Sequence, residues 1–201
     1  MTPFEFQVAF ERELNVFYKA LEKPTSDTTF YWLNQAVVKF VKTRYSGTNA
    51  KTTSFEQDQK RIDDLRTLVT RKTFTTKDKS VTSLYSKNEY SIELPGNYVF
   101  LVGTRVGILP RTDGYNKHLS CWNIDDDGNA VMRYVDPIEV THDTLDRELE
   151  NSLSEHRVHY CSAKPLKLLR GNRITFYTDD HYRVDEVQLE YIRMPRAITL
   201  V

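Results

Sequence analysis

Residues that commonly bind metals or act as nucleophiles cluster in one short segment of the sequence. His156, His159 and Cys161 lie close together along the chain, and Cys121 could join them in space. Zinc accepts such ligands, but their spacing fits neither a standard zinc finger nor a catalytic zinc pattern. A hydrolase could use the same residues as a Cys–His nucleophilic pair, although nothing in the sequence places the two groups together. The pattern favours structural roles for these side chains.

A second group that could bind a ligand is the acidic run Asp125–Asp127, which is followed by Gly128. If Gly128 takes the glycine position of a calcium-binding loop, Tyr134 stands where the loop requires a bidentate Glu. The site would then lack its strongest ligand, and the flanking segments have the pattern of strands. An Asp-Gly pair between strands is typical of a hairpin turn. The sequence therefore predicts a hairpin at Asp125–Asn129, with an ion at Asp125–Asp127 left as the alternative.

Composition narrows the class of protein. The 201 residues include 28 basic and 28 acidic side chains, so the formal charge is zero, and 39% of the residues are hydrophobic. A nucleic-acid-binding domain normally shows a basic excess, so this balance does not favour one. No apolar run approaches the roughly 20 residues that span a bilayer, and the first residues lack the pattern of a signal peptide. Two distant cysteines predict reduced thiols in a cytoplasmic setting. The sequence contains no glycine-rich phosphate-binding loop, so it gives no indication of a nucleotide cofactor.

The N-terminal third has the pattern of amphipathic helices. Apolar residues recur every three or four positions, and helix-capping residues precede each periodic segment. Three helices are expected, starting after caps at Thr2, at Ser26 or Asp27, and at Ser54. The third helix is Phe55–Val69, and the Thr-rich segment Thr70–Ser80 then forms a solvated linker or, alternatively, a partner-binding arm. We expect Tyr31, Trp32 and Tyr45 to pack in the core, with an aromatic stacking platform as the alternative.

The remainder of the chain has the pattern of antiparallel strands. Gly171-Asn172 separates two alternating segments and favours a two-residue hairpin turn. A third strand, Val187–Tyr191, should complete a meander, and further short strands are expected between residues 91 and 141. Asp143–Leu153 is expected to be a helix, because Leu145, Leu149 and Leu153 share one face.

These elements predict an α+β fold, in which an N-terminal bundle of about three helices packs with an antiparallel β-rich domain. The helical part is expected over residues 1–75, with the later helix near residues 143–153. The β-rich part is expected over residues 76–201, and the two parts are expected to form one connected structural unit.

Several phrases of the sequence together resemble a known family. They are Met1–Phe6, Phe55–Val69, Ile92–Phe100, Val158–Thr178 and Tyr191–Pro195. In combination they are similar to a ring (adaptor) protein of the head–tail connector in short-tailed phages of the crAss-like group. The similarity covers most of the chain and is carried by a pattern of short phrases.

The resemblance implies a structural virion protein, made in the host cytoplasm, with no enzymatic activity, no metal and no cofactor. It implies a ring of about twelve copies, closed by heterologous contacts between neighbouring subunits. Its implied partners are the portal protein and the next ring or tail protein, and no membrane. Genomic DNA would pass through the channel without sequence-specific binding, which suits a neutral wall better than a strongly basic one.

Candidate contact residues combine charge with apolar character in the third helix, the following segment and the C-terminal tail. The tail is expected to dock on its own sheet or to add a strand to a neighbour. The residues predicted to contact the portal or a neighbouring subunit are Phe55, Lys60, Arg61, Asp64, Arg66, Arg71, Lys72, Phe74, Ile198 and Leu200.

Three other functions remain as alternatives. The chain could be another virion component, such as a capsid or internal protein, which needs no ring. It could be a non-enzymatic binding module that recognises a glycan or peptide through the Asp125 hairpin and nearby aromatic residues. The third alternative is a hydrolase that uses His156, His159 or Cys161.

Overall fold

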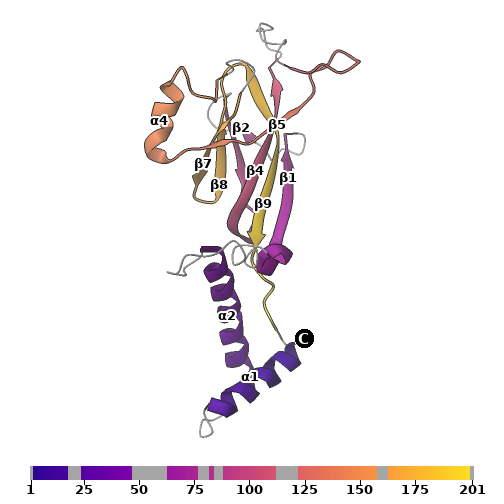
Figure 1. Cartoon of the computed structure of the whole chain (residues 1–201), viewed down its shortest axis with the longest axis vertical. Coiled ribbons are helices and arrows are strands. Elements are labelled where there is room, and N and C mark those ends of the chain that lie inside the picture. The colour runs from indigo at the N-terminus through magenta and orange to yellow at the C-terminus, as the bar shows by residue number, and fades with distance from the viewer. Residues whose placement is uncertain are drawn as a thin grey trace. The chain divides into compact units, whose positions relative to one another are not determined.

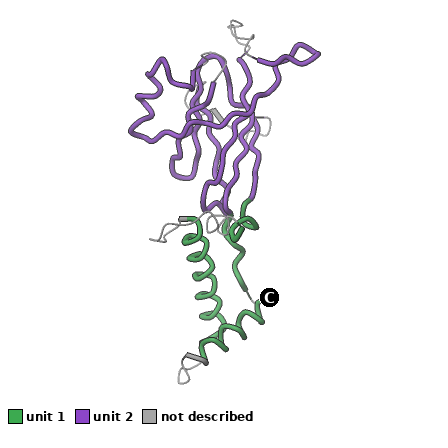
Figure 2. Tube along the Cα trace, viewed as in Figure 1, with its two compact units in different colours: residues 1–69, 193–201 green, residues 70–192 purple. Residues whose placement is uncertain are grey.

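The protein combines helices and sheets in two compact units. The computed structural model describes residues 2–17, 24–46, 63–76, 82–83, 88–111, 122–157 and 163–199. Unit 1 comprises residues 1–69 and 193–201, and unit 2 comprises residues 70–192 (Figure 2). The mixed helix-and-sheet class expected from the sequence is confirmed.

Unit 1 contains two described α-helices, whose starts are set by side-chain caps. Helix α1 spans Pro3–Phe17 (Figure 1) and begins with the predicted capping box. The amide of Thr2 donates to the Glu5 carboxylate at 2.8 Å, and the amide of Glu5 donates to the Thr2 hydroxyl at 3.3 Å. These bonds satisfy amides that the first helical turn leaves without intrahelical partners.

Helix α2 spans Ser26–Ser46. Its cap is Thr25, and not Ser26 or Asp27 as the sequence suggested. The hydroxyl of Thr25 accepts from the Thr28 amide at 3.4 Å, which is the contact expected between an N-cap and the third helical residue. All three polar residues are good caps, so local propensity alone does not choose among them.

The chain after α2 departs from the prediction. Residues 63–65 are helical, a 3-10 turn (η1) covers Arg66–Leu68, and strand β1 runs over Val69–Thr75. The expected linker Thr70–Ser80 is therefore wrong for its first half, while residues 55–62 of the expected third helix lie outside the described part. A Thr-rich segment pairs well in a sheet, and pairing with a neighbouring strand decided its conformation.

Unit 2 is built on two sheets. One has the strand order β1-β9-β4-β5 and the other has the order β2-β3-β8-β7-β6. In the first sheet the further strands are β4 (Tyr98–Pro110), β5 (Arg133–Val135) and β9 (Tyr182–Arg193). The second contains β2 (Thr82–Ser83), β3 (Glu89–Glu93), β6 (Ile138–Glu139), β7 (Leu166–Arg170) and β8 (Arg173–Tyr177).

One hydrophobic core joins the two sheets. Side chains from β1, β4 and β9 pack with side chains from β3 and β8 in this core. Its members are Phe74, Tyr90, Ile92, Leu94, Val106, Ile108, Trp122, Ala163, Ile174, Phe176, Tyr182, Val184, Val187, Leu189 and Tyr191. The two sheets thus bury their inner faces against each other, as in a β-sandwich.

The predicted hairpin at Gly171-Asn172 is confirmed, whereas the three-stranded meander is wrong. Strands β7 and β8 pair antiparallel around the turn, where Gly171 has a φ of +57°. Such a positive φ suits glycine because other residues meet steric resistance there. Strand β9 does not continue this sheet; it lies between β1 and β4 in the other one.

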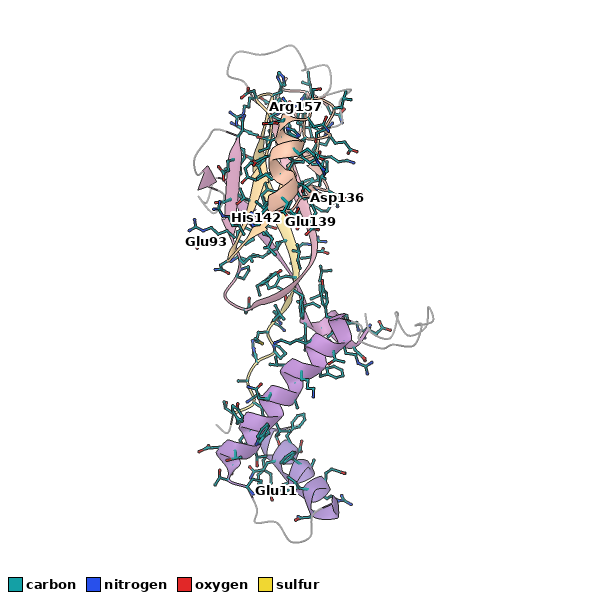
Figure 3. The ribbon with its side chains drawn as sticks, turned by 90° about the vertical axis from the view of Figure 1, so that its left-hand side faces the viewer. Glu11, Glu93, Asp136, Glu139, His142 and Arg157 are labelled. Carbon is teal, nitrogen blue, oxygen red and sulfur yellow. The ribbon has the colours of Figure 1, made fainter. Side chains whose placement is uncertain are left out.

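Helix α4 covers part of the second sheet. It spans His142–Glu150, three residues shorter at its C-terminal end than the predicted Leu153, with Thr141 as its N-cap. Leu145 and Leu149 pack on a small cluster formed by Val140, Leu166 and Leu168. Arg157 closes the helix by donating to the Leu149 carbonyl at 2.7 Å; Figure 3 labels Arg157 and His142 at the two ends of α4.

Replacement of Leu189 by Ala should lower the free energy of unfolding by about 3 kcal/mol, because it opens a cavity in the core between the sheets. Leu189 has no exposed surface, whereas Leu169 on β7 is 43% exposed. The matched variant Leu169→Ala should cost less than about 1 kcal/mol. Urea unfolding followed by circular dichroism measures both, and equal losses would contradict the assigned core.

Candidate interaction surfaces

Asp64 and Arg66 lie at the end of the helical segment that precedes β1. The carboxylate of Asp64 forms an ion pair with Arg44 of α2, at 3.2 Å from its Nε. The guanidinium of Arg44 also lies over the ring of Phe40, 5.1 Å from its centre. Asp64 therefore ties its own segment to α2, whereas Arg66 is exposed.

Three predicted contact residues lie on β1, an edge strand of its sheet. Arg71 is exposed and donates from Nε to Glu190 of β9 at 2.8 Å. Lys72 is exposed, and its ammonium lies 4.9 Å from the centre of the Phe74 ring. Phe74 requires a correction: it is only 4% exposed and belongs to the core of unit 2, so it offers no surface to a partner.

The C-terminal segment is held by α2. The side-chain amide of Asn34 donates to the Ile198 carbonyl at 3.1 Å, and its oxygen accepts from the Ile198 amide at 2.8 Å. Residues 194–199 form no strand, so docking of this described part of the tail on its own sheet is wrong, and the addition of a strand to a neighbour stays a prediction. The two hydrogen bonds between Asn34 and Ile198 are called the Asn34–Ile198 clasp below. The other predicted contact residues, Phe55, Lys60, Arg61 and Leu200, lie outside the described residues.

The helices of unit 1 expose an apolar surface that is absent from the predicted contact residues. Phe4, Tyr31 and Trp32 are more than half exposed, at 65%, 58% and 59%. Large hydrophobic side chains of α1 and α2 that lie at the surface are Phe4, Phe6, Val8, Tyr31, Trp32, Phe40 and Tyr45. The expectation that Tyr31, Trp32 and Tyr45 lie in the core is wrong for the chain as folded.

A sequence signal for this surface does exist. Phe30, Tyr31 and Trp32 are consecutive, and successive residues of a helix point about 100° apart. Three bulky neighbours cannot all face one core, and only Phe30 of the three is buried. The rings of Tyr31 and Trp32 instead pack edge to face, with their centres 5.5 Å apart.

The candidate metal and nucleophile residues are only partly described. Cys121, His159 and Cys161 lie outside the described part, whereas His156 is buried. The His156 carbonyl accepts a hydrogen bond from the Tyr182 hydroxyl at 2.7 Å. Among the described residues, no group of three His, Cys, Asp or Glu side chains could hold a metal ion.

The acidic run at Asp125 forms the predicted turn. Ile124 and Ala130 make an antiparallel bridge, and Gly128 has a φ of +83°. The carboxylate of Asp125 accepts from the Asn129 amide at 2.7 Å. At least one oxygen that the calcium interpretation needed therefore stabilises the turn itself.

Comparison of the sequence with protein-family models and with curated proteins found no match. Within the described ranges, none of the helices is both long enough and apolar enough to cross a membrane.

Replacement of Asn34 by Ala should release the C-terminal segment, because it removes both hydrogen bonds to Ile198. Hydrogen exchange at the Ile198 amide should accelerate by roughly fivefold, as expected when a bond worth about 1 kcal/mol is lost. Asn34→Asp keeps an acceptor and loses the donor, so its effect should be smaller. Gln35→Ala, at an exposed neighbouring position of α2, is the control; unchanged exchange in Asn34→Ala would contradict the clasp.

Tyr182 should make stability fall in alkaline solution. Burial of its hydroxyl, and secondarily the charge of Asp179, raises the pKa of Tyr182 above its ordinary value. The folded state thus favours the neutral hydroxyl, and the free energy of unfolding declines above the unfolded pKa of about 10, by at most about 1.4 kcal/mol per pH unit.

The variant Tyr182→Phe separates this effect from other titrations. At pH 7 it should lower the free energy of unfolding by about 1 kcal/mol, because the His156 carbonyl loses its donor. The difference in free energy of unfolding between Tyr182→Phe and the wild type should shrink as pH rises through 11, since only the wild type must keep a buried phenol neutral. Urea unfolding across this range measures it, with Tyr31→Phe as a control for an exposed hydroxyl. A difference that stays constant with pH would count against the assignment.

Proposed function

We propose that the chain is a structural virion protein that forms a ring in the head–tail connector of a short-tailed phage. In this role it joins the portal to the next ring or tail protein and surrounds the channel through which genomic DNA passes. The proposal includes an N-terminal bundle of about three helices, of which α1 and α2 are described. It assigns the chain no catalytic reaction, metal or cofactor.

The observation that carries the proposal is the apolar surface of the two helices. Among the described residues of α1 and α2, the buried hydrophobic side chains are Phe30 and Val41, fewer than the exposed ones on the same helices. Water-exposed aromatic clusters of this kind usually mark protein–protein contacts. An assembly protein, whose helices are covered by neighbouring subunits, accounts for such a surface.

Two further features support a ring. The resemblance of the sequence to connector ring proteins covers most of the chain. The equal numbers of acidic and basic residues leave no net charge to repel neighbouring copies or to hold the DNA backbone by its phosphates. Arg71 and Lys72 on β1 then remain candidates for contact with the portal or a neighbour.

Counting copies of this chain in purified phage particles tests the proposal. Quantitative mass spectrometry with isotope-labelled reference peptides should find this chain and the portal protein in equal numbers, about twelve each. The major capsid protein and the portal serve as internal standards for the two extremes of copy number. Copies in the hundreds would overturn the connector in favour of a capsid component, and absence from the particle would overturn any virion role.

A further inference from the structure

Each of the two helices of unit 1 carries a stripe with an exposed aromatic residue and one charged residue, and the two charges are opposite. We infer that the stripe Phe6–Glu13 on α1 of one copy docks along the stripe Trp32–Lys39 on α2 of a second copy, with the helices running parallel. As the subunit contact of a ring this inference rests on the proposed function. Self-association of the chain can nevertheless be measured without it.

Spacing gives the two stripes the same length. Phe6 and Glu13 are seven residues apart, as are Trp32 and Lys39. Seven residues are close to two turns, so each pair lies on one side of its helix, about 10 Å apart along the axis. All four side chains are exposed. A parallel arrangement therefore places Phe6 beside Trp32 and Glu13 beside Lys39 at once.

The charges of the two helices are complementary. The Phe6–Glu13 stripe carries the acidic Glu13, and the Trp32–Lys39 stripe carries the basic Lys39. The other charged residues of the two helices lie on other sides of α1 and α2. Opposite charges beside an aromatic contact fix the register and favour encounter of the two surfaces. A parallel contact between two α2 helices would instead bring their Lys39 side chains together.

Within one chain the two stripes do not meet. The side chain of Gln7 donates to the Ser26 hydroxyl at 3.1 Å, which places α1 against the first turn of α2. Figures 1 and 3 agree that α1 meets α2 at one end of α2 only. Lys39 lies thirteen residues beyond Ser26, about 20 Å further along the helix.

A second copy is the occupant that these observations favour. Every copy carries both stripes, so the contact joins two different surfaces and leaves one of each available at the ends of a dimer. Such a heterologous contact continues into a ring or a filament. It buries the Trp32 ring, and tryptophan is a frequent hot spot of protein interfaces.

Sedimentation velocity of the full chain, over about 1 to 100 µM, tests the contact. The wild type should self-associate as its concentration rises. Trp32→Ala should weaken this association by more than about tenfold, and Glu13→Lys or Lys39→Glu by several-fold, since each places like charges together. The matched controls are Leu153→Ala and Glu150→Lys, at exposed positions of unit 2, and both should associate like the wild type.

Mixing the two charge variants tests the pairing itself. A copy with Glu13→Lys meets a copy with Lys39→Glu through opposite charges at both of its contacts. An equimolar mixture should therefore associate as strongly as the wild type, although each variant alone does not. Circular dichroism spectra that match the wild type verify that the variants are folded.

Three outcomes would overturn the inference. They are a wild type that stays monomeric at about 100 µM, normal association of Trp32→Ala, and a mixture that fails to restore association. Copy counting in particles is an independent measurement. A monomeric chain present in portal-like numbers would end this inference and leave the proposed ring standing. Self-association of a chain that is absent from particles would support this inference and end the proposed ring in the connector.

Discussion

The fold of unit 2 depends on the burial of strand β9 between two other strands of its sheet. Five core residues come from this strand, and four of them, Tyr182, Val184, Val187 and Leu189, have no exposed surface. Along β9 every second residue is buried, first at Tyr182 and Val184. The alternation then shifts by one residue, so that Val187 and Leu189 are buried as well. One extra residue, as in a β-bulge, produces such a phase change and lets one strand face the core along its whole length. The opposing sheet supplies the other half of this core.

Unit 1 is stabilised differently from unit 2, because its described helices bury few hydrophobic side chains. Caps at Thr2 and Thr25, the Arg44–Asp64 ion pair and the Asn34–Ile198 clasp fix its local geometry. Polar contacts of this kind, which are exposed or only partly buried, each contribute about 1 kcal/mol, less than a buried hydrophobic side chain contributes. The stability and specificity of the helical unit should therefore come largely from association, which joins its exposed aromatic surface to the proposed role in assembly.

The candidate surface could be read from the sequence only in part. Basic residues of the predicted contact set do reach the surface at Arg66, Arg71 and Lys72. Phe74 does not, because strand alternation turns it toward the core once residues 69–75 join a sheet. The sequence favours core positions for Tyr31 and Trp32, and the structure exposes both rings, since helical periodicity does not say which faces of a helix find a partner within the chain.

The sequence by itself determined the elements whose signals are local. The capping box at Thr2, the hairpin turn at Gly171, the Asp125 turn and the helix after Thr141 all depend on hydrogen bonds or positive φ values within a few residues. The tertiary structure alone decided that β9 leaves the β7–β8 sheet, that residues 69–75 form a strand, and that Asn34 holds the tail. Each of these depends on a partner more than 100 residues away in the chain or on competition between strands, which no local pattern encodes.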